Sequence, residues 1–390
     1  MIPLIKSTFH NETQTKKELI RFIAKAPILS FSRECEKFER AFARFQGRKN
    51  CIFVNSGSSA NLALIQTLLN MGKIKKGDSV GFSTLTWSTN VMPLIQLGLH
   101  PVPVDVELST LNISSKTLKS TLKKRKIKLL FLTNLLGFCS DPDKITSICK
   151  KEGILLIEDN CEGLGSVYKG KKLGNFGIAS TCSFYVGHHM STIEGGVICT
   201  DSTELATQLR VVRAHGWDRN LSSGKQRKIR DRFNVNSTFY SRYTFYDLGY
   251  NLRPTEINGF IGNTQLKYLN EIISKRQSNF KKLAKKIYTD SRFYPIEFGH
   301  IDLISNFAFP VICKSKKIRD SLVEKCNGKL EIRPIVGGDM TQQPFFKKYT
   351  NDPSYISANA KLIHENGFYF GNNPELTDKE LNTIIDIICK

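Results

Sequence analysis

The chain has 390 residues, of which 40% are hydrophobic and 24% are charged, which is ordinary for a globular protein and leaves enough apolar surface for a sizeable core. The formal net charge of +22 suggests nucleic-acid binding, but the lysines are scattered, with short runs such as KKRKIK at 123–128, and no DNA- or RNA-binding module is recognisable. We interpret the charge as a solvated lysine-rich surface that also favours anionic nucleotide substrates, and we expect no nucleic-acid partner.

No segment approaches the roughly 18 to 20 uninterrupted apolar residues of a membrane span, and the start, MIPLIKSTFHNETQTKKELIRF, lacks the apolar region of a signal peptide. These features predict a cytoplasmic protein with no membrane partner. None of the ten cysteines forms a CxC or CxxC pair, so zinc ribbons and common iron–sulfur spacings have no support. We expect reduced, mostly buried thiols and no metal site.

From about residue 50 the sequence alternates short apolar runs with stretches of helical periodicity. The runs lie at 51–57, 79–84, 101–106, 128–137, 154–160, 180–187 and 195–200, and helix-like stretches such as 61–70 and 143–153 separate several of them. This alternation over 150 residues predicts an α/β domain with a largely parallel sheet, and a local antiparallel or turn element around 180–200.

Residues 219–247 are polar and basic, and they are predicted to form a long loop that is functional or disordered. A long helical pattern follows the string NLRPTEINGFIGNTQLKYL, and a second α/β region with apolar runs at 307–313 and 331–336 begins near residue 300. The predicted organisation is an N-terminal segment over 1–30 that packs with the small domain, a large domain over 31–250, and a small C-terminal domain over 251–390.

Polar residues that follow the apolar runs are candidate site residues, because open parallel sheets bind ligands at the carboxyl ends of their strands. After Val54, the string Asn55-Ser56-Gly57-Ser58-Ser59 opens a helix whose free N–H groups favour an anion such as phosphate, although an ordinary serine N-cap explains the same pattern. Asp159 ends a very apolar strand, where a buried carboxylate needs a partner. A protonated pyridine nitrogen is one such partner, with Glu162 in reach of the ring's 3-oxygen; a helix cap is the alternative for Asp159.

A third segment completes an ordered set of motifs: Ser183 ends a strand, two histidines follow, and Glu194-Gly195-Gly196 leads into the next strand. The set resembles the sugar aminotransferase family of fold-type-I pyridoxal-phosphate enzymes, whose elements are a Ser-Gly-Thr/Ser turn, a Glu-Asp-x-x-Gln strand end, and Ser-Phe-x-x-x-Lys with Glu-Gly-Gly six residues after the lysine. The resemblance covers nearly the whole chain and includes SFSRECEKFERAFARFQG near the N-terminus and GYNLRPTEINGFIG at 249–262. It implies the aspartate aminotransferase-like α/β fold, in which a large domain with a mostly parallel central sheet carries a smaller C-terminal α/β domain.

The chain departs from the family pattern where the cofactor-bonding lysine is expected. His188 stands six residues before Glu194, and no lysine lies between Lys172 and Lys225 to replace it through a small register shift. Glu162 stands where the aminotransferases usually carry glutamine. Both changes resemble the sugar 3-dehydratase branch of the family, and the lack of a CxC pair favours the branch that works without an iron–sulfur cluster.

The resemblance assigns cofactor-binding roles to the matching residues. It implies that Trp87 stacks on the cofactor ring and that Asp159 and Glu162 face its nitrogen and 3-oxygen. The residues implied for the phosphate are Gly57, Ser58 or Ser59, and Ser183. The cofactor is then pyridoxamine 5′-phosphate or pyridoxal 5′-phosphate, bound non-covalently.

The resemblance also implies partners and a reaction. Asn251 would reach the phosphate from the neighbouring subunit, which implies a homodimer with shared active sites, and His215, Arg219 and Arg333 would lie beside the substrate unless their roles are structural. His188 would act as the catalytic base in removing the C3 hydroxyl of a nucleotide-linked 4-keto-6-deoxyhexose, with the GDP-linked mannose form favoured. L-glutamate would then regenerate the amine form of the cofactor.

Three alternatives stay open. The chain is also compatible with a sugar aminotransferase that uses a distant lysine, with a cluster-dependent dehydratase of CDP-4-keto-6-deoxy-D-glucose, or with a catalytically inactive cofactor-binding or regulatory protein. For the second histidine, His189, a structural role is expected, because adjacent residues on an extended segment point in opposite directions.

Overall fold

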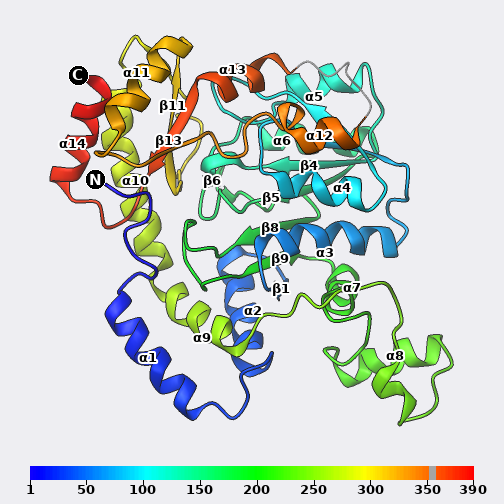
Figure 1. Cartoon of the computed structure of the whole chain (residues 1–390). Coiled ribbons are helices and arrows are strands. Elements are labelled where there is room, and N and C mark those ends of the chain that lie inside the picture. The colour runs from blue at the N-terminus through cyan, green and yellow to red at the C-terminus, as the bar shows by residue number, and fades with distance from the viewer. Residues whose placement is uncertain (351–356) are drawn as a thin grey trace.

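Seven strands form the central sheet of the computed structural model, which describes residues 1–350 and 357–390. Their order is β1-β9-β8-β5-β4-β2-β3 (Figure 1). The bounds are β1 (Asn50–Val54), β2 (Ser79–Ser83), β3 (His100–Val104), β4 (Leu129–Thr133), β5 (Leu155–Asp159), β8 (Ala179–Ser183) and β9 (Gly196–Thr200). Neighbouring strands are parallel except that β9 is antiparallel to both β1 and β8. The predicted, largely parallel sheet and the antiparallel element around 180–200 are confirmed.

Strand β4 shows why the sheet could be predicted from apolar runs. Leu129 and Phe131 join a buried cluster with α3 (Gly57–Asn70) and α7 (Thr203–Arg213) on one face. Leu130 and Leu132 join a cluster with α10 (Leu269–Ile287) and the small sheet on the other face. A sheet covered on both faces needs apolar side chains in both directions, so its strands are continuously hydrophobic. The helices of this part of the chain are α2 (Arg33–Gln46), α3 (Gly57–Asn70), α4 (Met92–Gln96), α5 (Ser115–Leu122), α6 (Pro142–Lys151), α7 (Thr203–Arg213), α9 (Glu256–Gln265) and α10 (Leu269–Ile287).

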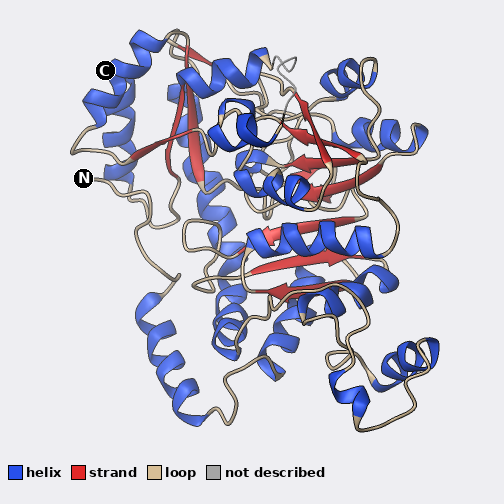
Figure 2. Cartoon of the chain, turned by 45° about the vertical axis from the view of Figure 1, so that its right-hand side comes forward, coloured by secondary structure: helices blue, strands red, loops and turns tan. Residues whose placement is uncertain are grey.

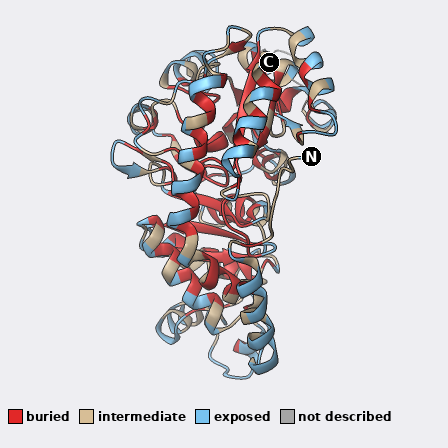
Figure 3. Ribbon diagram, turned by 90° about the vertical axis from the view of Figure 1, so that its left-hand side faces the viewer, coloured by how far each residue is buried: buried red, intermediate tan, exposed pale blue. Residues whose placement is uncertain are grey.

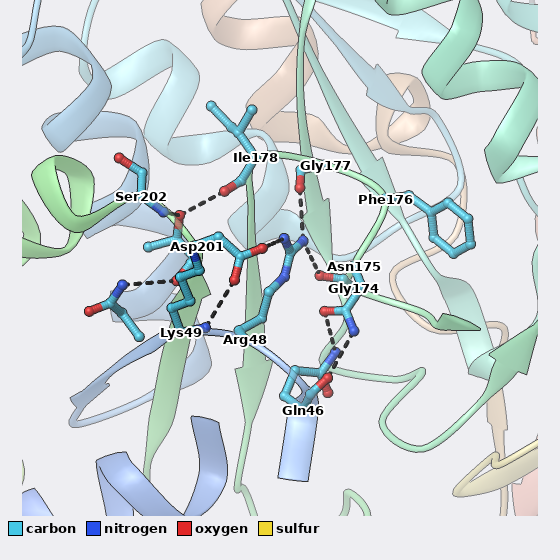
Figure 4. A network of polar contacts seen from close by, with 12 residues as sticks. Gln46, Arg48, Lys49, Gly174, Asn175, Phe176, Gly177, Ile178, Asp201 and Ser202 are labelled. Atoms are coloured by element: carbon cyan, nitrogen blue, oxygen red, sulfur yellow. Dashed lines mark hydrogen bonds and ion pairs between the residues drawn. The ribbon is translucent and has the colours of Figure 1, made fainter. Parts of the chain in front are cut away.

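The loop that leads into β8 is held by polar contacts at the end of α2. Figure 4 shows the Arg48 guanidinium between Asp201, at 2.8 Å, and the carbonyl oxygens of Gly174 and Gly177, at 3.0 and 2.8 Å. From the opposite side, the buried Glu158 carboxylate accepts backbone N–H bonds from Gly174 and Gly177 at 2.8 and 2.7 Å. Charge-assisted bonds of this kind are strong. They fix the start of β8, the strand that ends at the predicted site residue Ser183.

A four-stranded antiparallel sheet with the order β10-β11-β13-β12 forms the small C-terminal α/β region (Figure 2). Its elements are β10 (Phe293–Tyr294), β11 (Ala308–Cys313), α11 (Lys316–Cys326), β12 (Ile332–Pro334), α12 (Pro344–Tyr349), α13 (Ala358–Asn366), β13 (Gly367–Gly371) and α14 (Asp378–Cys389). With the central sheet, it confirms the predicted aspartate aminotransferase-like architecture.

The N-terminal residues touch the small sheet. Ile2 pairs with Leu330, and the Leu4 N–H donates to the Glu331 carboxylate at 2.8 Å. Helix α1 (Glu12–Lys25) instead packs against α9. The domain boundaries at residues 30 and 250 stay a prediction, because one buried cluster joins residues of the central sheet to residues of the small sheet.

The segment 219–247, predicted as a long loop, contains α8 (Ser223–Arg232) and a 3-10 helix at Tyr240–Tyr243. The helix escaped prediction because none of its residues is buried, so its sequence has no apolar periodicity. Its stability comes instead from helix-favouring lysine, arginine and glutamine and from the ion pair of Arg230 with Asp218 at 2.7 Å. Figure 1 shows α8 on an arm that projects from the body of the chain.

Buried residues gather on the sheets and on the inner sides of the helices (Figure 3). All ten cysteines lie in the described ranges and nine are buried, which confirms the prediction of mostly buried thiols. Within the described ranges, no helix is both long enough and apolar enough to cross a membrane.

Candidate active site

A cavity of about 640 Å³ opens at the carboxyl ends of β1, β5 and β8, beside the small sheet. Eight of the twelve residues predicted for the site line it, namely Gly57, Ser58, Trp87, Asp159, Glu162, Ser183, His188 and Arg333. They come from segments that lie far apart in the sequence, and the strand order of the sheet brings them together. None of the described residues that line this cavity is a lysine.

The N-terminus of α3 forms one wall of the cavity. Ser56 is the N-cap, because its hydroxyl accepts the Ser59 N–H at 3.0 Å, and it also bonds the Ser59 hydroxyl at 2.9 Å. Ser58 is exposed to the cavity, whereas Ser59 does not line it. A Cβ on Gly57 would lie 2.7 Å from the Ser183 Cβ, so only glycine allows this close approach. The serine cap is confirmed. Because the capped terminus still faces the cavity, phosphate binding there stays a prediction.

Asp159 is buried at the end of β5 and faces the cavity. Its Oδ2 accepts hydrogen bonds from the side-chain amides of Asn61 at 2.9 Å and Asn90 at 2.8 Å, and its Oδ1 accepts the Cys161 N–H at 2.9 Å. These bonds orient the carboxylate but supply no positive charge. A cation in the cavity, such as a protonated ring nitrogen, would complete its environment.

Glu162 is buried beside Asp159, and its carboxyl accepts the Leu136 N–H at 2.9 Å. Burial raises the pKa of Glu162 to about 8, and the negative charge of Asp159 adds to the shift. The side chain is therefore a neutral acid at pH 7, able to donate a hydrogen bond into the cavity. Tyr369 on β13 also lines the cavity, and burial raises the pKa of its phenol to about 12.

His188 lies in the cavity wall between two aromatic rings, with ring centroids 5.8 Å from Tyr185 and 5.2 Å from Phe307. Its Nδ1 is buried and has no hydrogen-bond partner among the described residues. Burial lowers the pKa of His188 to about 4; Asp159 opposes this shift and Arg276 adds to it. The imidazole is consequently neutral at pH 7 and can take up a proton.

His189 points away from the cavity, and its Nε2 lies 3.1 Å from the carbonyl oxygen of Ser305 in a buried environment. The geometry behind this separation differs from the expected one. The histidines lie in a turn, closed by a bond from the His188 N–H to the Tyr185 carbonyl at 2.9 Å, and not on an extended segment.

Four predicted site residues lie outside the cavity of a single chain: Ser59, His215, Arg219 and Asn251. The His215 ring packs against Trp217, with ring centroids 4.8 Å apart. The Arg219 guanidinium lies over the rings of Trp217 and Tyr243. Asn251 accepts a hydrogen bond from Arg253 at 3.0 Å. Their assignment to cofactor and substrate stays a prediction.

Several residues that line the cavity were not predicted. Among them are Leu4, Ile5, Thr89, Asn90, Thr133, Cys161, Tyr185, Phe307, Glu331 and Tyr369. Asn90 and Cys161 lie within three residues of Trp87 and Asp159, which were predicted for the site, and could have been found with them. Leu4, Phe307 and Tyr369 had no such signal, because only the packing of the small sheet brings them to the cavity.

The lining fits pyridoxal or pyridoxamine phosphate. The α3 terminus suits a phosphate, the Asp159 carboxylate suits a protonated pyridine nitrogen, and the Glu162 acid could donate to the ring oxygen. The Trp87 side chain is 52% exposed beside the cavity, which leaves its face available for stacking. Among the described residues, no group of three His, Cys, Asp or Glu side chains is arranged to hold a metal ion.

Fold and cavity together define an enzyme of the aspartate aminotransferase-like class. The chain belongs to the DegT/DnrJ/EryC1/StrS aminotransferase family, whose model matches residues 10–389. It is 35% identical over 384 residues to the GDP-4-keto-6-deoxy-D-mannose 3-dehydratase of Escherichia coli O55:H7, covering 97% of each chain. It is 33% identical to the protein of the same name from Yersinia pseudotuberculosis, covering 99% of each. A crystal structure of GDP-4-keto-6-deoxymannose-3-dehydratase with a trapped PLP-glutamate geminal diamine matches over the full length of both chains, with 31% identity and a TM-score of 0.90.

Proposed function

We propose that this chain removes the C3 hydroxyl of GDP-4-keto-6-deoxy-D-mannose, giving the 4-keto-3,6-dideoxy sugar, with non-covalent pyridoxamine phosphate as cofactor and L-glutamate as amino donor. The observation that carries the proposal is His188, which lines a cavity suited to the cofactor where the described lining offers no lysine. The names of the relatives support the nucleotide and the sugar. The product would be a precursor of a deoxysugar such as colitose in lipopolysaccharide O-antigen.

Different residues of the chain would hold different parts of the cofactor. Gly57, Ser58 and Ser183 would hold the phosphate at the α3 terminus, Asp159 would keep the ring nitrogen protonated, and Trp87 would stack on the ring. Bound in this way, the amine form of the cofactor supplies an amino group for the C4 ketone of the sugar and a ring that delocalises electrons.

His188 moves the protons. Because its imidazole is neutral at pH 7, His188 would accept, at a ring nitrogen, the proton lost from the carbon that bears the cofactor's amino group, and would return it to the oxygen of the departing C3 hydroxyl. The rings of Tyr185 and Phe307 pack against the imidazole and limit its rotation. A lysine in its place would bond the cofactor and favour transamination, whereas imidazole forms no such bond and leaves elimination as the outcome.

The raised pKa of Glu162 predicts that cofactor binding weakens at alkaline pH. Its acid form donates to the ring oxygen, and this donor is lost as pH rises through the pKa of about 8. We expect the affinity for pyridoxal phosphate, measured by absorbance titration, to fall above pH 8. The variant Glu162→Gln keeps a donor at every pH, so its affinity should stay level between pH 7 and 9. An equal decline in both proteins would contradict this role.

We also propose that two subunits share their active sites, with Asn251, His215 and Arg219 of one subunit completing the cavity of the other. The arm over 219–248 supports the proposal, because it exposes large apolar side chains that monomers seldom leave uncovered. The exposed fractions are 72% for Phe239, 71% for Tyr240, 69% for Tyr243, 57% for Phe245 and 71% for Leu248. A second copy of the chain would cover them.

Shared sites predict complementation between inactive subunits. Co-expressed His188→Asn and Asn251→Ala subunits should regain activity, because each mixed dimer contains one site with both native residues. Random pairing should restore about a quarter of the wild-type activity per subunit. In the control pair, His188→Asn with Asp159→Asn, both residues belong to the cavity of their own subunit. Each cavity of the mixed dimer then carries one altered residue, so the pair should stay inactive. Failure of the first pair, with dimers present, would show that the sites are not shared.

The reaction is tested by incubating the purified chain with pyridoxamine phosphate, L-glutamate and either GDP-4-keto-6-deoxy-D-mannose or CDP-4-keto-6-deoxy-D-glucose, and weighing the products by mass spectrometry. The proposal expects a GDP sugar lighter by one oxygen atom, with one 2-oxoglutarate and one ammonia formed per turnover. Neither iron nor a reductase should be required.

Each alternative gives a different result. An aminotransferase would return a sugar that retains nitrogen, and borohydride would trap its pyridoxal phosphate on a lysine. Preference for the CDP sugar together with an iron and reductase requirement would indicate the cluster-dependent enzyme. Cofactor binding without conversion of either sugar would indicate an inactive binding protein.

A further inference from the structure

Arg276, in the middle of α10, is a buried cation whose hydrogen bonds go to backbone carbonyls. Its Nη1 donates to the carbonyl oxygens of Phe307 at 3.2 Å and Asn372 at 2.6 Å, and its Nη2 donates to that of His188 at 3.1 Å. No carboxylate in residues 1–350 and 357–390 forms an ion pair with it, and burial lowers the pKa of its guanidinium to about 9. Burying a charge without a counter-ion costs folding free energy. A buried arginine beside the His188 turn is therefore a candidate for a functional role.

The three carbonyls belong to three different segments. His188 is in the turn after β8, Phe307 precedes β11, and Asn372 follows β13. Figure 1 shows α10 running from the large sheet to the small one, so the planar guanidinium joins the turn to the small sheet. Asn372 returns a bond from its side-chain amide to the Arg276 carbonyl at 2.9 Å, which fixes the helix in the same arrangement.

Phe307 links these contacts to the imidazole itself. Arg276 holds the Phe307 backbone, and the Phe307 ring lies against the His188 ring with centroids 5.2 Å apart. Arg276 therefore acts on His188 in two ways, through the backbone of the histidine and through the aromatic ring that supports its side chain. A lysine has a single point charge and cannot donate to three carbonyls in one plane with this geometry.

The charge of Arg276 also acts on His188. The charged or titratable groups that act on this imidazole are Asp159, which favours its protonated form, and Arg276, which disfavours it; His189 is its buried neighbour. The other charged or titratable residues of the main cavity are Cys161, Glu162, Tyr185, Glu194, Glu331, Arg333 and Tyr369. His10 and Glu375 line a small second cavity together with His188 and Arg276. Because Arg276 does not line the main cavity, its charge opposes that of the Asp159 carboxylate from outside the space proposed for the substrate.

We infer that Arg276 is a positioning residue for the proposed base: it fixes the His188 turn and the supporting Phe307 against the small sheet, and it places a positive charge beside the turn that carries the imidazole. The inference rests on the proposed function for its catalytic consequence, but not for its effect on the histidine. Arg276 touches neither substrate nor cofactor, because it does not line the main cavity.

The test compares Arg276→Met, which removes the charge and the donors, with Arg276→Lys, which keeps the charge. Histidine titrations by NMR on the cofactor-free protein measure the first effect. We expect the His188 midpoint to rise in Arg276→Met and to stay near the wild-type value in Arg276→Lys. An unchanged midpoint in Arg276→Met would overturn the electrostatic part of the inference, whichever reaction the enzyme catalyses.

Kinetics measure the positioning effect. We expect kcat of Arg276→Met to fall about 10- to 100-fold with KM and cofactor affinity unchanged, because small displacements of a catalytic group carry losses of this size. Arg276→Lys should recover part of the lost kcat.

The matched control is Arg213→Lys. Arg213 is also buried, and its guanidinium pairs with the Glu39 carboxylate at 2.5 Å, outside the cavity. This substitution should lower the melting temperature and leave kcat and the His188 midpoint unchanged. Equal kcat losses in Arg213→Lys and Arg276→Lys, or a rise in KM alone, would overturn the inference. A wild-type chain that releases no deoxygenated sugar would refute the proposed function and leave the NMR result to decide the role of Arg276.

Discussion

Replacing His188 by asparagine is expected to lower kcat for deoxygenation by about 100- to 10,000-fold, the usual contribution of a general acid–base. Asparagine keeps a polar side chain in the turn but cannot take up a proton. The cofactor affinity should stay close to the wild-type value, because His188 is not among the residues proposed to hold the phosphate or the ring. Single-turnover assays with pyridoxamine phosphate already bound, together with an absorbance titration of cofactor binding, separate the two effects.

His189→Asn provides the matched control for this prediction. His189 is buried, and its ring nitrogen contacts the Ser305 carbonyl, so the change should lower the melting temperature. The activity per folded molecule should fall much less than in His188→Asn. If His189→Asn instead abolished turnover and His188→Asn did not, the assignment of the base would be wrong.

Replacing Asp159 by asparagine is expected to weaken cofactor binding by about 100- to 1,000-fold, equivalent to about 3–4 kcal/mol, because one partner of a buried charge pair is lost. The amides of Asn61 and Asn90, which donate to the native carboxylate, would then face another amide. The ring nitrogen would lose its proton and with it much of its capacity to accept electrons. Equilibrium dialysis of pyridoxal phosphate measures the affinity.

A suitable control is Asp143→Asn, which removes an ion pair with Lys169 on the outside of the molecule. It should leave the cofactor affinity unchanged, since an exposed ion pair contributes little to the free energy of folding. Unaltered affinity in Asp159→Asn would mean that the pyridine nitrogen lies elsewhere in the cavity, and the proposed orientation of the cofactor would have to be abandoned.

The sequence by itself determined the central sheet and much of the candidate site. Strands buried on both faces are continuously apolar, so their ends could be located. The polar residues at or just after those ends, Ser58, Asp159 and Ser183, line the cavity. The resemblance to the family pattern, in which the cofactor-bonding lysine stands six residues before Glu-Gly-Gly, singled out His188. The same logic failed for α8, in which no residue is fully buried. Strand β13 was also not identified, although its short aromatic run GFYFG is bounded by glycines.

Only the tertiary structure decided how these residues behave. The pKa values of about 8 for Glu162 and about 4 for His188 arise from burial, which depends on the packing of segments that are remote in the sequence. The same is true of Leu4, Phe307 and Tyr369 in the cavity wall, and of the bond from Arg276 to the His188 carbonyl. Local sequence patterns report which face of an element is buried, but the dielectric environment and the hydrogen-bond partners of a side chain belong to the assembled fold.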